Sequence, residues 1–280
     1  MRLFDSHCHL DFAEFDADRA EVLKRARAAG VHDLLVPGYE PEQWPRVVAL
    51  VPQAAEHDVH LHVAVGIHPY ALTEGASGWV GRPEGELASV LMNAARQHGA
   101  AAIGECGLDA PLGQREGERC RLAQQGAVLR EHLHAASACE LPLVLHVVRA
   151  HALALELLRE AALRSPPSPH PRGVIHAFSG SAERVREYVG LGFMLAFGGS
   201  LTHSNHARAH AAARATPDTA LLIETDAPSG RLAGGPPRNE PSQLAEVLRA
   251  LAALRDTTPE HVASVTSRNA CALFRVNSGA

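Results

Sequence analysis

Short apolar runs alternate with longer stretches of mixed apolar and polar residues along the whole chain. We predict a strand for each short run and a helix for each longer stretch, with Gly30 and Gly99 as helix stops. The predicted strands span residues 3–8, 33–37, 61–67, 100–104, 143–145, 174–175, 193–197 and 221–223. The predicted helices span residues 18–29, 42–58, 84–98, 115–140, 150–164, 182–191, 205–215, 241–255 and 259–274, and a proline-rich loop spans residues 165–171.

Eight strands that each precede a helix predict one particular fold. Strict alternation of strand and helix implies a parallel sheet, and eight such units imply a closed barrel. We therefore expect an α/β protein, a (β/α)8 TIM barrel that forms a single domain over residues 1–280 and ends in additional C-terminal helices. A doubly wound open sheet is the alternative, but it more often has about five to seven strands. The chain has no GxGxxG motif after its first strand and no Walker loop.

Composition and charge narrow the choice of partner and compartment. The net charge of −5 argues against a broad basic surface for nucleic acid, although it allows a small phosphate-binding cleft. The five cysteines are scattered without CxxC spacing, so they form neither a disulfide framework nor a zinc ribbon. No run reaches about 18 apolar residues and the N-terminus lacks a signal-peptide pattern. We expect a cytoplasmic protein without a membrane segment or a stable protein partner.

The first ten residues carry the first sign of chemistry. Asp5, His7 and His9 alternate with other residue types at the end of the first predicted strand. Because side chains two residues apart on a strand share a face, His7 and His9 are expected to project together and begin a transition-metal site. Asp5 is expected to hold one ring nitrogen. The alternative is a pair of polar residues leaving an edge strand.

Further polar residues stand at the ends of the other predicted strands. In a barrel these ends share the C-terminal rim, where enzymes of this fold place their chemistry. Four histidines and two carboxylates at these ends, leaving out His68, suffice for two divalent ions about 3.5–4 Å apart. Some two-metal barrels bridge their ions with a carboxylated lysine, but Lys24 is the only lysine of this chain. Glu105, between Gly104 and Gly107, is therefore the natural bridging ligand. Asp109 is expected to brace the loop. The rim residues are His7, His9, His68, Glu105, His146, His176 and Asp226.

With these residues in place, the chain resembles the TatD-type metal-dependent deoxyribonucleases of the amidohydrolase superfamily. The resemblance covers nearly the whole chain, and it is the set of motifs in this order that is specific. The motifs are Asp5-Ser-His7-Cys-His9, Gly66-Ile-His68-Pro69, Gly104-Glu105-Cys-Gly-Leu-Asp109, His146-Val-Val-Arg149-Ala-His151, His176-Ala-Phe-Ser-Gly180, Gly198-Gly199, Glu224-Thr-Asp226-Ala-Pro228, Arg238-Asn239-Glu240-Pro241 and Arg268-Asn269-Ala270.

The resemblance implies a ligand set and an activity. His7, His9 and Asp226 would hold one ion, His146 and His176 would hold the other, and Glu105 would bridge them. The implied activity is hydrolysis of phosphodiester bonds in DNA, often from strand ends and in the form of a 3'-5' exonuclease, with magnesium, manganese or zinc. The sequence departs from the family pattern at Val147, Cys106 and Ser229-Gly230, and the last of these leaves substrate preference open.

Two-metal activation of water is the mechanism that we expect from these residues. Asp226 is expected to accept the water proton as well as to bind metal. Arg149 and Arg238 are candidates for phosphate contacts, with surface or inter-loop ion pairs as the alternative. His68 is expected to bind substrate or to protonate the leaving group, with a structural histidine before Pro69 as its alternative.

Two other classes of function remain open. The same metal pair would hydrolyse another ester, a lactone, an amide or an aminoacyl ester, since water activation is the same. A non-catalytic metal-stabilised scaffold is the third reading, and it predicts a closed set of ligands.

Overall fold

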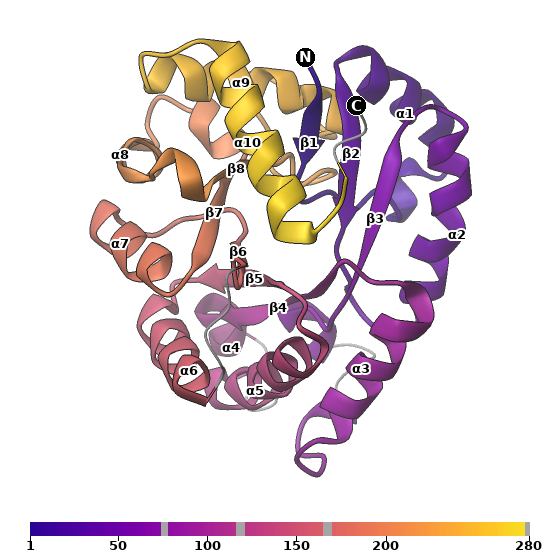
Figure 1. Cartoon of the computed structure of the whole chain (residues 1–280), viewed down its shortest axis with the longest axis vertical. Helices are drawn as coiled ribbons and strands as arrows, with labels where there is room; N and C mark the ends of the chain where they lie inside the picture. The colour runs from indigo at the N-terminus through magenta and orange to yellow at the C-terminus, as the bar shows by residue number, and fades with distance from the viewer. Residues whose placement is uncertain (74–77, 116–120, 165–169, 278–280) are drawn as a thin grey trace.

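The computed structural model describes residues 1–73, 78–115, 121–164 and 170–277. Its eight strands form one parallel sheet whose strand order follows the chain. The backbone N–H of Ser6, after the first strand, donates to the carbonyl of Ile223 in the last strand at 3.2 Å, so the sheet curls into a nearly closed barrel (Figure 1). The predicted (β/α)8 barrel is therefore confirmed. The strands are β1 (Leu3–Asp5), β2 (Val31–Val36), β3 (His60–Val65), β4 (Ala102–Asp109), β5 (Leu143–Val148), β6 (Gly173–Ile175), β7 (Phe193–Phe197) and β8 (Leu221–Ile223).

Helices cover the outside of the sheet because each presents an apolar stripe to it. In the second helix the buried residues Trp44, Val47, Leu50 and Ala54 recur every three or four positions. The helices are α1 (Arg19–Ala28), α2 (Trp44–Ala55), α3 (Glu86–His98), α4 (Ala110–Arg115), α5 (Leu122–Cys139), α6 (His151–Arg164), α7 (Ala182–Gly190), α8 (Ala207–Ala215), α9 (Leu244–Leu254) and α10 (Pro259–Phe274). Short 3-10 helices are η1 (Ala13–Phe15), η2 (Pro69–Thr73), η5 (Gly199–Thr202), η6 (Asp218–Ala220) and η7 (Pro241–Gln243). No helix in the described ranges is long and apolar enough to cross a membrane.

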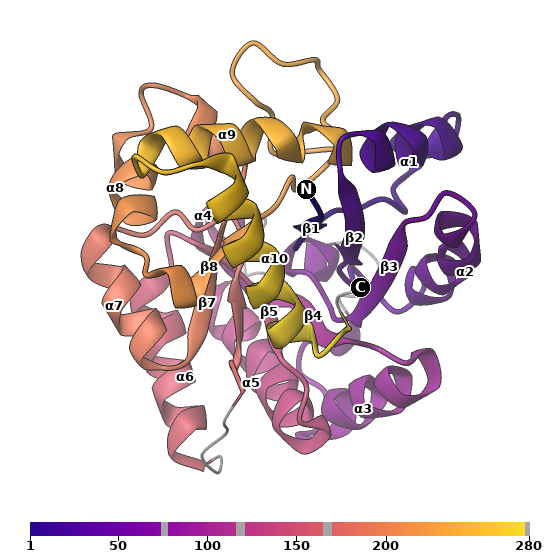
Figure 2. The same ribbon diagram turned by 45° about the horizontal axis from the view of Figure 1, so that its top comes forward.

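The last helix closes one end of the barrel. Apolar side chains from all eight strands, among them Phe4 and Met194, form a small inner core together with Leu273 and Phe274 of α10. The rings of Phe4 and Phe274 stack with centroids 5.6 Å apart. Figures 1 and 2 show α10 lying across the centre of the ring of helices. Because the hydroxyl of Ser267 in α10 donates to the carbonyl of Arg2, just before β1, at 2.9 Å, α10 covers the N-terminal end, and the C-terminal ends of the strands remain for the site.

Many element boundaries differ from the predicted ones by a few residues, and three differences bear on the site or on the described ranges. β1 ends at Asp5, so the two histidines that follow lie in an extended segment beyond the strand. β4 continues to Asp109, pairing with β5 through Asp109↔Val148, although its glycines and polar residues break the apolar pattern that marks a strand. The predicted helix over 115–140 corresponds to the end of α4 and to α5, and its residues 116–120 lie outside the described ranges, as do 165–169 of the predicted proline-rich loop.

Candidate metal centre

The carboxylate of Glu105 lies at the middle of the polar residues on the C-terminal rim. The side chain is 1% exposed, and each of its two oxygens faces a different set of imidazoles. Oε2 lies 3.1 Å from Nε2 of His7 and 3.5 Å from Nε2 of His9. Oε1 lies within 3.2 Å of three imidazole nitrogens: Nε2 of His68 at 3.2 Å, Nδ1 of His146 at 3.1 Å and Nε2 of His176 at 3.1 Å.

Two backbone bonds and a glycine fix the position of Glu105. Its backbone N–H donates to the carbonyl of Gly38 at 2.9 Å, and the N–H of Gly38 donates to the carbonyl of Gly104 at 2.9 Å. Gly104 has a φ of +142°, and a Cβ at this position would lie 2.4 Å from the carbonyl oxygen of Val144. Only glycine allows this close approach of β4 to β5. The glycine before Glu105 is thus explained by packing of the strand that carries the carboxylate.

The end of β8 brings Asp226 to the two N-terminal histidines. The backbone N–H of Asp226 donates to the carbonyl of His7 at 2.9 Å, and the N–H of His9 donates to the carbonyl of Ala227 at 2.8 Å. Oδ1 of Asp226 consequently lies 3.9 Å from Nε2 of both histidines. Residues at opposite ends of the chain therefore face the same side of Glu105.

Asp5 has a different role from the predicted one. Its carboxylate accepts hydrogen bonds from the backbone N–H of Thr225 at 2.9 Å, from the Thr225 hydroxyl at 2.5 Å and from the backbone N–H of His7 at 3.3 Å. It does not bind an imidazole nitrogen, because its short side chain points into the junction between β1 and β8. Asp5 thus holds the backbone that carries His7 and Asp226.

Two other carboxylates hold the far ring nitrogens of His146 and His176. Oδ2 of Asp109 lies 3.1 Å from Nε2 of His146, while Oδ1 of Asp109 accepts the N–H of Leu112, so this residue braces its loop as predicted and also orients a histidine. Oε1 of Glu224 lies 3.1 Å from Nδ1 of His176. A carboxylate at the far nitrogen fixes the ring and directs the lone pair of the near nitrogen toward Glu105. The role of Glu224 was missed by sequence reasoning, although it stands two residues before Asp226.

His68 differs from His146 and His176 because its neutral ring presents a proton, and not a lone pair, to Glu105. Its Nδ1 accepts the backbone N–H of Tyr70 at 3.0 Å, so Nε2 carries the proton and donates to Oε1 of Glu105. Burial lowers the pKa of His68 to about 4, which keeps the ring neutral near neutral pH. The Tyr39 ring stacks on it with centroids 5.2 Å apart and planes 12° apart. In this arrangement His68 is a hydrogen-bond donor.

The donor set fits divalent cations. Oε2 of Glu105 is buried without a hydrogen-bond partner in the described ranges, although two imidazole nitrogens lie within 3.5 Å of it. Burial opposes the charge of Glu105, but the imidazoles around it, led by His68 and His176, lower its pKa well below the usual range, so the carboxylate is ionised. A cation between these atoms would satisfy both the orphaned oxygen and the imidazole lone pairs. The described residues contain three groups with metal-ligand geometry: His7, His9 and Glu105; His7, His176 and Asp226; and His68, Glu105 and His146.

Burial also shifts the pKa of two other candidates, His7 and Asp226, in the metal-free protein. It lowers the pKa of His7 to about 4, with His176 adding to the effect because the two rings stack at 3.9 Å. A neutral imidazole is the form that binds a metal. Burial raises the pKa of Asp226 to about 6, against the opposing influence of His176 and His9. A carboxylate with this pKa is suited to proton transfer near neutral pH.

The two arginines predicted to bind phosphate lie in different surroundings. Arg149 directly follows β5 and is exposed at the C-terminal rim. Arg238 donates two hydrogen bonds to the carboxylate of Asp18, at 2.7 and 2.8 Å, and a third to the carbonyl of Glu14 at 2.7 Å. This inter-loop ion pair is the alternative considered for Arg238 from the sequence, and it occupies the guanidinium in this structure.

A (β/α)8 barrel with buried histidines around a shared carboxylate at its C-terminal rim defines a class, the metal-dependent hydrolases of this fold. The chain belongs to the TatD-related DNase family, whose family model matches residues 4–275.

Relatives of known sequence and structure agree with this assignment. YjjV of Escherichia coli K12, described as a metal-dependent hydrolase, is 34% identical over 278 residues, 98% of each chain. The crystal structure of E. coli YjjV, a TatD homologue, superposes with a TM-score of 0.81 at 31% identity and covers 99% of each chain. TatD of Cronobacter sakazakii, described as a 3'-5' ssDNA/RNA exonuclease, is 32% identical over 282 residues, 99% of each chain.

Proposed function

We propose that this protein is a metal-dependent exonuclease that removes nucleotides from the 3' end of single-stranded DNA. The observation that carries the proposal is the division of the Glu105 carboxylate, with Oε2 facing His7 and His9 and Oε1 facing the histidines of β5 and β6. One buried carboxylate shared by two sets of ligands is the arrangement that two-metal phosphoryl hydrolysis requires. The activity described for the Cronobacter relative supports the choice of substrate.

We assign the ligands to two divalent ions, magnesium, manganese or zinc. His7, His9, Asp226 and Oε2 of Glu105 would hold one, and Oε1 of Glu105, His146 and His176 would hold the other. When bound, such ions lower the pKa of a water molecule and offset charge on the phosphate oxygens.

The protein's own groups then position the substrate and move a proton. Asp226 accepts the proton of the attacking water, since burial brings its pKa to about 6 before metal binds. The Nε2–H of His68, which donates to Glu105 in the absence of substrate, donates instead to a phosphate or leaving oxygen when substrate is bound. Arg149 contacts phosphate from the end of β5. Arg238 would have to leave Asp18 to do the same, so we assign it to the joining of two loops.

Domain organisation and location belong to the same proposal. We propose one hydrolase domain over residues 1–280, because the eight strands from β1 to β8 form one sheet. We also propose the cytoplasm as its location. Four cysteines in the described ranges, Cys8, Cys106, Cys139 and Cys271, are free thiols, as in a reducing compartment.

The experiment is a digestion by metal-stripped protein reloaded separately with magnesium, manganese and zinc. We expect metal-dependent, ladder-like shortening of 5'-labelled single-stranded DNA, and release of labelled mononucleotide when the label is at the 3' end. Glu105→Gln should abolish both, while Glu156→Gln, an exposed control on α6, should cleave like the wild type. If two ions bind per chain but no metal supports cleavage, the nuclease assignment fails, and esters, lactones and amides are the substrates to test next.

A further inference from the structure

The arginines on the two sides of the C-terminal rim differ in whether they form ion pairs with carboxylates. Several arginines of α1, of α2 and of the segment just before η7 are bound to carboxylates. Arg25 and Arg238 both bind Asp18, and Arg25 also binds Glu240 at 2.8 Å. Arg19 and Arg46 share Asp16. The positive charge on this side of the rim is therefore neutralised.

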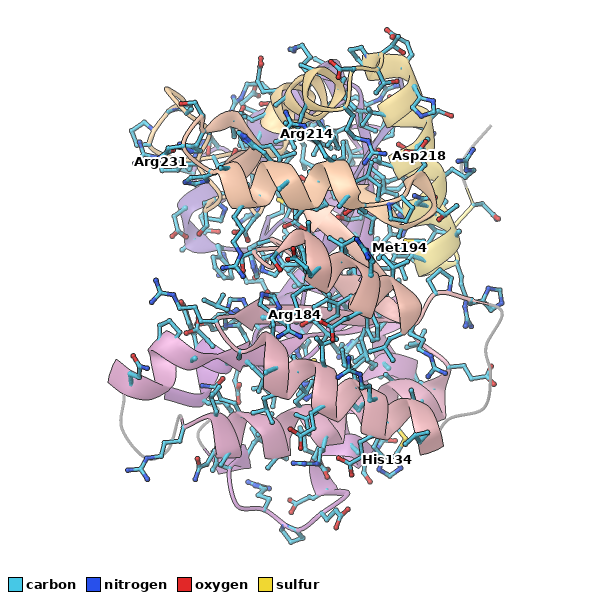
Figure 3. All side chains as sticks on the ribbon, turned by 90° about the vertical axis from the view of Figure 1, so that its left-hand side faces the viewer. His134, Arg184, Met194, Arg214, Asp218 and Arg231 are labelled. Carbon is cyan, nitrogen blue, oxygen red and sulfur yellow. The ribbon has the colours of Figure 1, made fainter. Side chains whose placement is uncertain are left out.

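Three arginines on the other side have no such partner. Arg149 follows β5, Arg208 lies in the first turn of α8 after β7, and Arg231 lies in the loop after β8. All three are exposed, and none forms an ion pair with a residue in the described ranges. The carbonyl of Arg231 accepts a hydrogen bond from Nε2 of His203 at 2.9 Å, which ties the loops after β7 and β8 together. Figure 3 shows Arg231 on the side of the barrel opposite α10, whereas Asp218, which precedes β8, lies on the side of α10.

A partly buried histidine lies beside this arginine group. Nδ1 of His151 is 2.9 Å from the hydroxyl of Tyr188, and Nε2 is buried without a partner in the described part of the chain. Burial lowers the pKa of His151 to about 4, and the positive charges of Arg208 and Arg184 act in the same direction. Arg184 is paired with Glu187 at 2.6 Å, so Arg208 supplies the unpaired charge. The unpaired guanidinium of Arg208 suits an anion.

Aromatic side chains lie after β1 and β3, across the C-terminal opening of the barrel from Arg149 and Arg208. Because strand order follows the chain around the barrel, residues after β1 to β3 lie opposite those after β5 to β7. Phe12, after β1, stacks on His9 with centroids 4.5 Å apart. Tyr70, after β3, lies 4.9 Å from the His68 ring and is 39% exposed, unusually open for a large aromatic residue of this protein. An exposed ring face beside a phosphate-binding centre is a platform on which any nucleobase can stack.

We propose that a single strand crosses the mouth of the barrel in one direction, a proposal that rests on the proposed function. The base of the terminal nucleotide stacks on Tyr70, and its linking phosphate lies over the Glu105 cluster. The phosphates of the preceding nucleotides lie along Arg149, Arg208 and Arg231. The strand is therefore held by local contacts on each side of the cluster, which fits a protein of net charge −5.

The arginine path is tested by substrate length. The Arg208→Gln/Arg231→Gln double variant is compared with an Arg96→Gln/Arg249→Gln control, which makes the same charge change at exposed positions on α3 and α9. We expect the double variant to lose at least tenfold more kcat/KM on a twelve-nucleotide thymidylate strand than on the dinucleotide, mainly through KM. The control should match the wild type. Equal losses on both substrates, or no loss on the longer one, would overturn the path.

A binding measurement separates this proposal from the nuclease assignment. Metal-free protein and a labelled twelve-nucleotide strand are titrated by fluorescence anisotropy at several salt concentrations. Loss of two phosphate contacts should reduce the salt dependence of log K by about 1.4, at about 0.7 for each contact. If this reduction is found but no metal supports cleavage, the path stands and the nuclease assignment fails. If the wild-type slope is already flat, the path is wrong whether or not DNA is cleaved.

The aromatic platform is tested at the terminal base. Tyr70→Ala should raise KM about tenfold on strands of either length, in line with the usual contribution of base stacking. Tyr70→Phe keeps the ring and removes the hydroxyl, which contacts Asp109 at 3.4 Å, so its KM should lie much closer to that of the wild type than to that of Tyr70→Ala. A strand whose terminal nucleotide lacks a base should be handled equally by wild type and Tyr70→Ala. A tenfold difference that persists on this strand would show that Tyr70 does not bind the base.

Discussion

His132 is a buried histidine outside the candidate metal ligands, and it predicts a specific dependence of stability on pH. Its Nε2 accepts the backbone N–H of Ile67 at 3.0 Å, and its Nδ1–H donates to the carbonyl of Val128 at 2.8 Å. The ring is therefore neutral, and it ties the segment that carries His68 to α5. Burial lowers the pKa of His132 to about 4.

The sign and size of the effect follow from this lowered pKa. Because the unfolded chain binds the proton more readily, the contribution of His132 to stability is complete above the unfolded pKa of about 6.5 and is lost as the pH falls toward 4. Between about pH 7.5 and about pH 5 the loss amounts to roughly 2 kcal/mol, of a total near 3 kcal/mol for the whole shift.

The assay is urea unfolding of metal-free wild type and His132→Gln at a series of pH values. Glutamine retains a donor and an acceptor but does not titrate, and the other buried histidines are present in both proteins, so they cancel in the difference. We expect the wild type to lose roughly 2 kcal/mol more than His132→Gln between about pH 7.5 and about pH 5. A difference between the two proteins that stays constant over this range would refute the buried neutral state of His132.

Three further predictions concern the site. Asp226→Asn should lower kcat at least about 100-fold while the thermal midpoint stays within a few degrees of wild type, measured by single-strand digestion and calorimetry; near-normal turnover would remove Asp226 as the proton acceptor. Glu224→Gln should weaken metal affinity about 10–100-fold in a chelator competition, because it alters the partner of His176 Nδ1, and unchanged affinity would contradict that role. Gly104→Ala should lower both soluble yield and urea midpoint, since its Cβ would lie 2.4 Å from the Val144 carbonyl, whereas Gly190→Ala, with open space around the added atom, should not.

The barrel and its candidate ligands could be predicted because both depend on local order in the sequence. Each strand is a short apolar run, and the residue that follows it is delivered to the same rim by the parallel topology. This rule alone predicts that His146 and His176 lie at the site, and both lie 3.1 Å from Glu105. Where the pattern was broken by glycines, as in β4, the strand was predicted too short, although its rim residue was identified.

Side-chain contacts between residues of different strands could not be predicted from the sequence in the same way. Glu224 contacts His176 across the end of β7, because β6 and β8 are both paired with β7, and the sequence does not specify contacts between strands that are not neighbours. Asp5 was assigned to an imidazole from its spacing, but closure of the barrel brings Thr225 closer to it. Arg149 and Arg238 looked equivalent as sequence features, and they differ only because Asp18 reaches one of them.

The charge distribution of the centre gives a physical reason for its expected dependence on metal. Five imidazoles surround one buried carboxylate, and the rings of His7 and His176 stack 3.9 Å apart, so protonating both would place like charges in contact. Without protons, several nitrogen lone pairs and Oε2 of Glu105 face one another with no donor between them. Burial opposes protonation of His176, but Glu105 and Glu224 raise its pKa well above the usual range, so this ring holds a proton beside the neutral His7. Oε2 of Glu105 still has no hydrogen-bond donor in the described ranges. Asp109, Glu224 and the backbone of β4 hold the ligands in place. Bound divalent cations would replace this proton and satisfy Oε2 at once, which is a physical reason for so polar a cluster at the open end of an apolar barrel.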